Sequence, residues 1–376
     1  MQNNTLSRAE LDAAGDVLDI HYGDVLIKYG SVLDATDNTI PHIISGHESA
    51  NYAYLQDGDI IVADTAEDET VGKTVELLNV SDRKIEAGLH TVPCRPLFPF
   101  ASKYLGYYMN SPHYHKQLIP LMQGIKVLSI SKGNISKTEI TSPQTIAEQE
   151  KISHFLYLLD QRAATQCKII DALKKYKRGL LQDMFPQKGE AVPKLRLAGF
   201  IGAWEQRKVS ELFRVTRGYV LASSQTDTIK TDEMPYPVYS SQTKDKGLMG
   251  YYKDYLYEDA ITWTTDGANA GTVNYRAGKF YCTNVCGVLL SNEVKANQMI
   301  AEALNNVAKG YVSYVGNPKL MNNVMADIVI HIPTKAEERE LLSSLFSNLD
   351  NLITLHQRRL DTLMQCKNGM LQQLFI

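Results

Sequence analysis

Residues 143–185 read PQTIAEQEKISHFLYLLDQRAATQCKIIDALKKYKRGLLQDMF, and residues 333–375 read PTKAEERELLSSLFSNLDNLITLHQRRLDTLMQCKNGMLQQLF. The two stretches align without a gap at an offset of 190 residues, and 13 of their 43 paired positions are identical. Average composition would give roughly two or three identities by chance. The chain therefore contains a duplication, in which each copy closes a longer and more variable segment.

Both copies have the pattern of a long helix. Pro143 and Pro333 stand where a helix can begin, and acidic residues crowd the first turns, as the helix dipole favours. Apolar residues then recur mostly every three or four positions over about 40 residues, which at 1.5 Å rise gives a helix of roughly 60 Å. The predicted seam residues are Ile152, Phe155, Leu159, Ile170, Leu173 and Leu180 in the first copy, and Leu342, Leu345, Leu349, Leu352, Leu363 and Leu374 in the second.

Two arrangements would bury such a stripe. Each helix could pack on its own globular domain, or the two helices could pair with each other as a coiled coil. Equal length and similar ends favour mutual pairing. Since the chain leaves the first helix through a second domain and then returns, we expect an antiparallel pair with pseudo-twofold symmetry.

Length and composition limit the class of protein. With 376 residues, 44% hydrophobic and 22% charged, the chain can bury two ordinary domain cores. The sequence contains no apolar run long enough to cross a bilayer and no signal-peptide pattern at its start, so we expect a cytoplasmic protein. The five cysteines are dispersed along the chain and do not indicate a disulfide framework. Cys282 and Cys286 are a close pair, but no second pair of ligands accompanies them, so their spacing is better explained by alternation along a strand than by a zinc site.

The net charge of -3 provides no global basic field, so any nucleic-acid ligand requires a local concentration of basic residues. One such concentration lies at the end of the first helix and in the linker after it, although a run of this kind is also typical of a solvated helix face. Its members are Lys168, Lys174, Lys175, Lys177, Arg178, Lys188, Lys194 and Arg196.

The predicted fold class is α+β, with two mixed α/β domains that are each followed by a long helix. In the second domain we expect strands near Tyr236–Tyr239, 260–264, 272–275, 279–282 and 285–290, turns at Asp266-Gly267 and Ala277-Gly278, and a helix over 297–308. Similar parts in the same order in the first segment indicate that the duplication includes the variable halves. The predicted boundaries are 1–142 (first domain), 143–186 (first helix), 187–195 (linker), 196–332 (second domain) and 333–376 (second helix).

These residues resemble the specificity subunits of Type I restriction-modification systems. The resemblance rests on the doubled helix motif Glu-x-Glu, Leu-Asp, Lys-x-Gly-Leu/Met-Leu-Gln-x-Met/Leu-Phe, and on the lead-in Pro-Lys-Leu-Arg-x-x-Gly-Phe-x-x-x-Trp-Glu-x-Arg-Lys at residues 193–208. The stretches Ala9-Glu-Leu-x-x-x-Gly15 and Ile20-His-Tyr-Gly-Asp-Val-Leu-Ile-Lys-Tyr29 are also similar to the family. The lead-in occurs only before the second domain, so the first target-recognition domain is expected to be shortened at its N-terminus.

The resemblance implies a DNA-binding protein with two target-recognition domains, each reading one half of a split sequence in double-stranded DNA, held apart by the helices. It also implies partners: two DNA methyltransferase subunits that use S-adenosylmethionine, and restriction or translocase subunits that use ATP and Mg. No cofactor, metal or catalytic residue is expected in this chain, since the sequence shows no dinucleotide-binding, phosphate-loop or base-methylating motif.

Reading base edges requires side chains such as Arg or Lys for guanine and Asn or Gln for adenine, while further basic residues hold phosphates. We predict DNA contacts from polar loops in both domains. In the second domain the candidates are Arg217, Ser240, Ser241, Gln242, Lys244, Lys246, Thr265 and Asn269; in the first they are Lys28, Lys73, His90, Lys126, Lys132 and Asn134. The alternatives are a self-contained methyltransferase or nuclease, and a coiled-coil scaffold without a nucleic-acid role.

Overall fold

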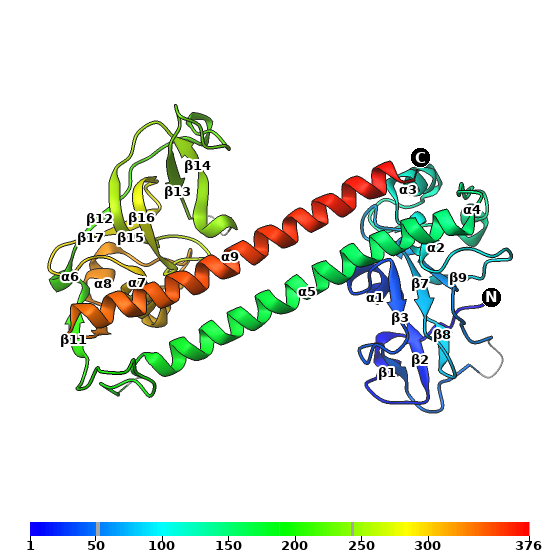
Figure 1. The fold of residues 1–376 in the computed structure, drawn as a ribbon, viewed down its shortest axis with the longest axis horizontal. Coiled ribbons are helices and arrows are strands. Elements are labelled where there is room, and N and C mark those ends of the chain that lie inside the picture. The colour runs from blue at the N-terminus through cyan, green and yellow to red at the C-terminus, as the bar shows by residue number, and fades with distance from the viewer. Residues whose placement is uncertain (50–52, 188, 242–243, 376) are drawn as a thin grey trace. The chain divides into compact units, whose positions relative to one another are not determined.

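The chain forms two compact units built around two long helices. The computed structural model describes residues 1–49, 53–187, 189–241 and 244–375. Unit 1 comprises Met1–Cys167 with Arg358–Ile376, and unit 2 comprises Lys168–Gln357. Helices α5 (Ile146–Met184) and α9 (Ala336–Gln373) each contribute residues to both units (Figure 1). The two predicted long helices are therefore confirmed.

Each long helix begins a few residues after its proline rather than at it. At the start of α5, the amide of Glu148 donates to the backbone carbonyl of Thr145 at 3.2 Å and to its hydroxyl at 3.3 Å. Thr145 thus satisfies an amide that has no partner within the helix. Pro143 lies before this cap, where its fixed backbone interferes with nothing.

Unit 1 has two four-stranded sheets and several short helices (Figure 1). One sheet has the order β1 (Leu11–Asp12), β4 (His42–Ile43), β2 (Val17–Ile20), β8 (Lys84–Ala87), and the other β3 (Val32–Asp34), β7 (Thr74–Leu78), β5 (Ile60–Ala63), β9 (Thr91–Cys94). A small pair joins β6 (Thr65–Ala66) to β10 (Leu128–Ser129), and the helices are α1 (Tyr22–Ile27), α2 (Tyr104–Tyr108), α3 (Pro112–Leu118) and α4 (Lys132–Ile135), with 3-10 turns at Arg8–Glu10 and Ile119–Leu121.

Unit 2 is built on a six-stranded sheet. Its order is β12 (Phe213–Arg217), β17 (Cys286–Ser291), β15 (Tyr257–Thr264), β16 (Val273–Cys282), β13 (Tyr236–Tyr239), β14 (Leu248–Tyr252). A separate pair joins β11 (Glu205–Lys208) to β18 (Val329–Ile332), and the helices are α6 (Val209–Leu212), α7 (Gln298–Ala308) and α8 (Asn322–Asp327), with 3-10 turns at Ser223–Gln225, Lys244–Gly247 and Lys309–Tyr311. The prediction of mixed domains joined to long helices is confirmed.

Two details of the predicted sheet are wrong. Ala277-Gly278 does not end a strand, because β16 runs through it and absorbs the irregularity as a register shift opposite Asp259, whose carboxylate accepts the amide of Gly278 at 2.8 Å. Cys282 and Cys286 do not alternate along one strand; they lie on β16 and β17, which follow each other in the chain but are separated by β15 in the sheet. Both thiols are buried, and burial raises the pKa of each, that of Cys286 to about 11, so both remain protonated at neutral pH.

The same backbone contacts recur inside both units. The amide of Gly72 donates to Ala63 and that of Gly271 to Thr264, each at 2.9 Å. The side chain of Asn110 bonds both backbone groups of Thr74, just as the side chain of Asn305 bonds those of Val273. The hairpins Gln123–Ser129 and Ser313–Lys319 are each closed by a reciprocal pair of amide bonds. The duplication therefore includes the variable halves, as their order of parts predicted.

Within unit 1 the first part of α5 packs with the last part of α9 on the domain core. Leu156 of α5 is fully buried in the cluster that holds Leu371 and Phe375. The Phe375 ring meets Tyr104 and Tyr108 edge-on, with ring centroids 5.7 and 5.6 Å apart. Burying one such aromatic ring stabilises a core by roughly 3 kcal/mol or more.

Within unit 2 the same packing occurs with the helices exchanged. Here the last residues of α5 join the first part of α9: Phe185 lies 5.6 Å from Trp204 and 5.7 Å from Phe346 between ring centroids. Phe185 and Phe375 are paired positions of the repeat, and so are Leu156 and Phe346. In each unit the start of one helix meets the end of the other, so the predicted antiparallel pairing is confirmed, and each stripe also packs on a domain core.

A repeated lysine and aspartate join the helices in both units. In unit 1 Lys367 Nζ lies 2.6 Å from Asp160 Oδ1, and in unit 2 Lys177 Nζ lies 2.7 Å from Asp350 Oδ1. In unit 2 the carboxylate of Glu302 on α7 is also 2.6 Å from Lys177. The duplication therefore preserved one interhelical ion pair at equivalent positions.

The seam differs from its predicted membership at two positions. Phe155 and Leu352 are 41% and 44% exposed, whereas Leu156 and Phe346, which the stripe omitted, are fully buried. Near its start α5 faces a domain core as well as its partner helix, and this buries Leu156 in place of Phe155. Of the other predicted seam residues, Leu159, Ile170, Leu342 and Leu349 are buried, and Ile152, Leu173, Leu180, Leu345, Leu363 and Leu374 are partly buried.

The lead-in segment before the second domain is part of the core of unit 2. Arg196 forms a two-pronged ion pair with Glu338 at 2.8 and 2.9 Å, and Glu338 is 1% exposed. At the paired position in unit 1, Glu148 is exposed. Thus Arg196 and Lys177 of the predicted basic concentration are engaged in ion pairs, and Lys188 lies outside the described residues. None of the described helices is both long and apolar enough to span a membrane.

Candidate nucleic-acid interface

In unit 2 two of the predicted loops line one pocket. The loop after β13 contributes Ser240 and Lys246, and the loop between β15 and β16 contributes Asn269. Between them lies a pocket of about 230 Å³ on the face of the sheet that carries Thr262, Asn274 and Arg276. Side chains alternate along a strand, and the neighbouring residues Ile261, Val273 and Tyr275 face the core beneath α7. The pocket therefore occupies the sheet face opposite that helix. The remaining lining residues are Trp263, Thr264, Thr272 and Cys286.

The first of these loops has an unusual backbone. Asp245, Lys246 and Gly247 all have positive φ, at 50°, 54° and 90°. Such a conformation costs roughly 1–2 kcal/mol for each non-glycine residue and persists only where surrounding contacts hold it. Here the carbonyl of Gly247 accepts the amide of Ser240 at 2.8 Å, and the carbonyl of Lys246 accepts Nη2 of Arg276 at 2.7 Å.

The side chain of Arg276 lies buried at the bottom of the pocket. It is 6% exposed, its Nε donates to the hydroxyl of Thr262 at 3.0 Å, and its guanidinium carbon lies 3.6 Å from the centroid of the Tyr239 ring. Burial lowers the pKa of this guanidinium below its ordinary value. No ion pair of the described residues includes Arg276, and residues 242 and 243, which lie outside them, are Gln and Thr.

The second loop is braced by its own hydrogen bonds. The amide of Gly267 donates to Pro318 at 2.9 Å, and that of Leu320 to Thr265 at 2.9 Å, so the hairpin Ser313–Lys319 lies against this loop. The hydroxyl of Thr265 is within 2.7 Å of Asp266 Oδ2 and 3.0 Å of the Val285 carbonyl. Thr265 therefore holds the loop in shape, while Asn269 lines the pocket.

The remaining predicted residues of the second domain lie apart from the pocket or outside the description. Arg217 is exposed at the end of β12, where its carbonyl accepts the hydroxyl of Tyr257 at 2.7 Å. Ser241 is partly buried beside Ser240. Gln242 lies outside the described residues, and of Lys244 only the backbone is described.

Unit 1 pairs a loop and a hairpin in the same way. The amide of Ile130, just after the hairpin Gln123–Ser129, donates to Asp64 at 2.8 Å, and β10 of this hairpin pairs with β6 of the loop after β5. His90 lies beside this loop with φ of 54°, and its Nδ1 is 3.2 Å from Asp64 Oδ1. Lys126 is exposed in the hairpin. The structure thus brings His90 beside this loop and Lys126 into its hairpin, a loop and hairpin that are equivalent to those of unit 2.

Four other predicted residues of unit 1 bond backbone groups of their own unit. The side chains of Lys28, Lys73, Lys132 and Asn134 donate to backbone carbonyls. The acceptors are Thr39 for Lys28, Leu26 for Lys73 at 2.7 Å, Met1 for Lys132 at 3.3 Å, and Leu121 for the side-chain amide of Asn134 at 3.0 Å. Burial lowers the pKa of Lys73. Lys73 and Asn134 are partly buried, which fits a structural role better than base reading.

The hairpin tips share an exposed aliphatic side chain. Ile125 is fully exposed and Val315, at the paired position, is 93% exposed. The neighbouring loop of unit 1 carries Glu67, Asp68 and Glu69, whereas that of unit 2 has Gly267, Ala268 and Asn269 at its tip. The two units thus present different chemistry on the same scaffold.

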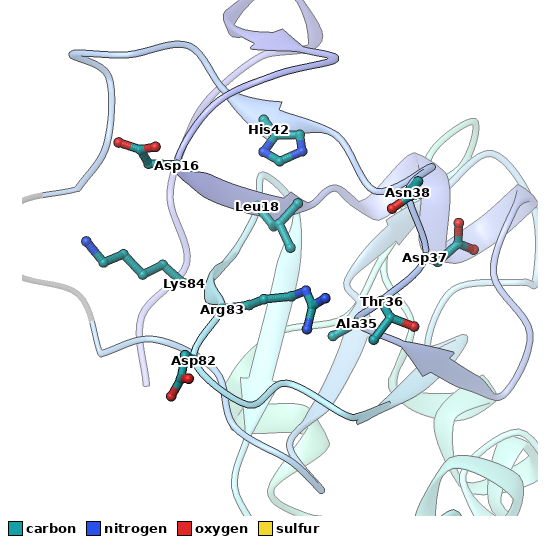
Figure 2. A pocket seen from close by; sticks show the side chains of 10 residues that line it. All are labelled: Asp16, Leu18, Ala35, Thr36, Asp37, Asn38, His42, Asp82, Arg83 and Lys84. Carbon is teal, nitrogen blue, oxygen red and sulfur yellow. The ribbon is translucent and has the colours of Figure 1, made fainter.

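A further pocket in unit 1 holds none of the predicted residues. It measures about 340 Å³ and combines three carboxylates with His42, Arg83 and Lys84. Figure 2 shows that the carboxylate of Asp82 points away from the charged ends of Asp16 and Lys84, so the three groups do not converge on one ligand. Across the described residues no group of three or more His, Cys, Asp or Glu side chains is placed to hold a metal ion.

Sequence reasoning missed Arg276. The pattern placed the end of a strand at Tyr275 and a turn at Ala277-Gly278, which assigned the arginine to a surface turn. The signal was present in the alternation: Val273 and Tyr275 face the core, so Asn274 and Arg276 must share the opposite face if the strand continues.

Comparison with known proteins gives one consistent result. A model of the family described as "Type I restriction modification DNA specificity domain" matches residues 202–365. The N-terminal part of a putative Type I specificity subunit of Mycoplasma pneumoniae is 37% identical over 141 residues, which cover 37% of this chain and 74% of that protein. A second putative specificity subunit of the same organism is 36% identical over 116 residues, covering 30% of this chain but only 38% of that protein.

A solved structure shows a similar fold over the whole chain. The crystal structure of the S subunit of a Type I restriction-modification system from M. genitalium aligns with a TM-score of 0.71 at 16% sequence identity, covering 100% of this chain and 93% of that one. The arrangement of mixed domains and long helices therefore has an experimental counterpart.

Proposed function

Since this chain belongs to the specificity subunits of Type I restriction-modification systems, we propose that it selects a split DNA sequence for such a complex, with each unit reading one half. Specificity subunits are the non-catalytic members of these systems. The observation that supports the proposal is an arrangement that occurs twice: a loop braced by a hairpin, with different side chains in each unit, on a duplicated pair of helices.

The reading residues follow from the geometry of the two surfaces. In unit 2, Asn269, Ser240 and Lys246 line one pocket between two loops, so they can meet the same stretch of DNA. Amide side chains suit adenine edges, hydroxyls adapt to several bases, and lysine holds phosphate or guanine. In unit 1 the candidates beside the equivalent loop and hairpin are His90 and Lys126, next to an acidic loop that disfavours phosphate contacts at that point.

The helices serve as the spacer between the two readers. Half-sites separated by unread bases require readers held at a fixed distance and rotational phase, and we assign this role to the continuous helices of 39 and 38 residues. Their exposed faces are then available to partner subunits. We propose two methyltransferase subunits that bring S-adenosylmethionine, and restriction or translocase subunits that bring ATP and Mg.

Binding and turnover can be tested separately. The chain is reconstituted with its methyltransferase partner, and the observed association constant for duplex DNA is measured against salt concentration. We expect a steep linear fall of log K with log salt, because neutralised phosphates release counterions. The chain alone, incubated with DNA and S-adenosylmethionine, should transfer no methyl group.

Two outcomes would overturn the proposal. A flat salt dependence would favour the scaffold, since a protein without a nucleic-acid role releases no counterions. Methyl transfer by the lone chain would favour the self-contained enzyme.

A further inference from the structure

The side chain of Arg276 is a buried cation with no anionic partner among the described residues. Its contacts are the hydroxyl of Thr262, the carbonyl of Lys246 and the ring of Tyr239, all of which are neutral. Buried arginines are ordinarily paired with carboxylates, because desolvating an unpaired charge is costly. The residual positive charge at the pocket floor therefore attracts an anion.

The rest of the pocket fits the same ligand. Lys246, whose exposed Nζ lies 3.4 Å from Asp350 Oδ2, adds a second cation, and Ser240, Asn269 and Asn274 add hydroxyl and amide groups. The described residues that line the pocket include no carboxylate. Guanidinium and amide donors are well matched to phosphate oxygens. A volume of about 230 Å³ gives room for a phosphate group but excludes a folded peptide or a second helix.

We propose that the Arg276 pocket holds one phosphodiester group of the DNA backbone and thereby sets the position of unit 2 on the duplex. This inference rests on the proposed function and assigns different roles to two residues of the pocket. Arg276 positions the domain without reading sequence, whereas Asn269 at the rim reads bases. The left-handed turn at Asp245–Gly247 is then held in place by the residue that binds the backbone.

The test compares salt dependence in matched variants of the reconstituted complex. Arg276→Gln removes the charge and keeps amide donors for Thr262 and Lys246. The control Lys295→Gln removes the same charge just before α7, which covers the other face of the sheet. We expect Arg276→Gln to weaken specific and non-specific duplexes alike and to reduce the slope of log K against log salt by about 1, with the methylated motif unchanged. The control should keep the wild-type slope.

A second variant covers the chance that Arg276→Gln disturbs the fold. Asn274→Asp is nearly isosteric and places a carboxylate in the pocket beside the intact arginine. This variant should keep the wild-type melting temperature, and its slope of log K against log salt should still fall by about 1. Circular dichroism of both variants verifies the fold.

Several outcomes would overturn the inference. Unchanged slopes in both variants would show that no DNA phosphate occupies the pocket, and a changed methylation motif would make Arg276 a base reader. If inorganic phosphate raises the melting temperature of the full-length chain, and Arg276→Gln abolishes that rise without altering the DNA slope, the pocket serves a free phosphate. Failure of the wild-type complex to bind DNA would instead refute the proposed function.

Discussion

Replacing Lys177 by methionine should destabilise unit 2 far more than any exposed lysine on the same helix. Lys177 lies 2.6 Å from Glu302 and 2.7 Å from Asp350, and the side chains of the three residues are only 16%, 7% and 17% exposed. Burial acts to lower the pKa of Lys177, but attraction from both carboxylates outweighs it, so the pKa is raised and the lysine stays charged. Methionine keeps most of the aliphatic stem but leaves the buried Glu302 carboxylate without a cation, while Asp350 keeps only the longer ion pair with Lys246 at 3.4 Å.

The size of the effect follows from that arrangement. Removing one partner of a buried ion pair costs about 3–5 kcal/mol, and the residual exposure here favours the lower end. Unit 2 spans residues 168–357, and for a unit of this size about 3 kcal/mol corresponds to a fall in melting temperature of roughly 6–12 °C. Lys367→Met at the paired position should cost about 1 kcal/mol, since Asp160 is 28% exposed and keeps the Tyr107 hydroxyl as donor.

Differential scanning calorimetry of the full-length chain measures these shifts. Lys175→Met is the matched control, because Lys175 is exposed on the same helix. The expected order of destabilisation is Lys177→Met, then Lys367→Met, then the control. A shift for Lys177→Met no larger than that of Lys175→Met would refute the claim that the repeated ion pair stabilises the joined helices.

Three further predictions follow from single residues. Glu338→Gln should lower the urea midpoint by the equivalent of about 3 kcal/mol, because it leaves Arg196 without its carboxylate, while the paired change Glu148→Gln on the exposed helix start should leave the midpoint unchanged. Asp19 has its pKa raised by burial to about 7, so the folded state holds a proton that the unfolded chain releases near pH 4; the free energy of unfolding should therefore fall between about pH 4 and 7, and Asp19→Asn should remove that fall in chemical denaturation across pH. Asn269→Ala should relax the methylated motif in one half only, with a loss of about 1–3 kcal/mol in base discrimination, as read from methylated DNA libraries; relaxation in both halves would contradict the assignment of one unit to each half.

The sequence predicted the paired long helices because the duplication can be recognised by aligning the two copies, without a structure. Paired identities such as Asp160 with Asp350 and Lys177 with Lys367 marked residues that the structure joins across the helices. The order of strands and helices in the second domain also followed from alternation and turn chemistry. These features depend on local pattern, which one sequence contains.

The reading surface was less predictable because it depends on contacts between distant segments. The sequence predicts an exposed loop hydroxyl at Thr265, yet in the structure this residue is buried and its hydroxyl donates to the carbonyl of Val285. Arg276 reads as part of a turn, yet β16 continues through that turn and buries it beneath Tyr239. Phe155 matches the helical spacing as well as Leu156 does, and only the position of the domain core decides which of them is buried.

The most direct test of the central claim is to map methylated bases genome-wide in cells that carry this chain with its partner subunits. Two dissimilar readers on one paired-helix mount should produce a motif of two short specific halves separated by a fixed number of unread bases. A continuous motif, or halves whose spacing varies from site to site, would contradict it.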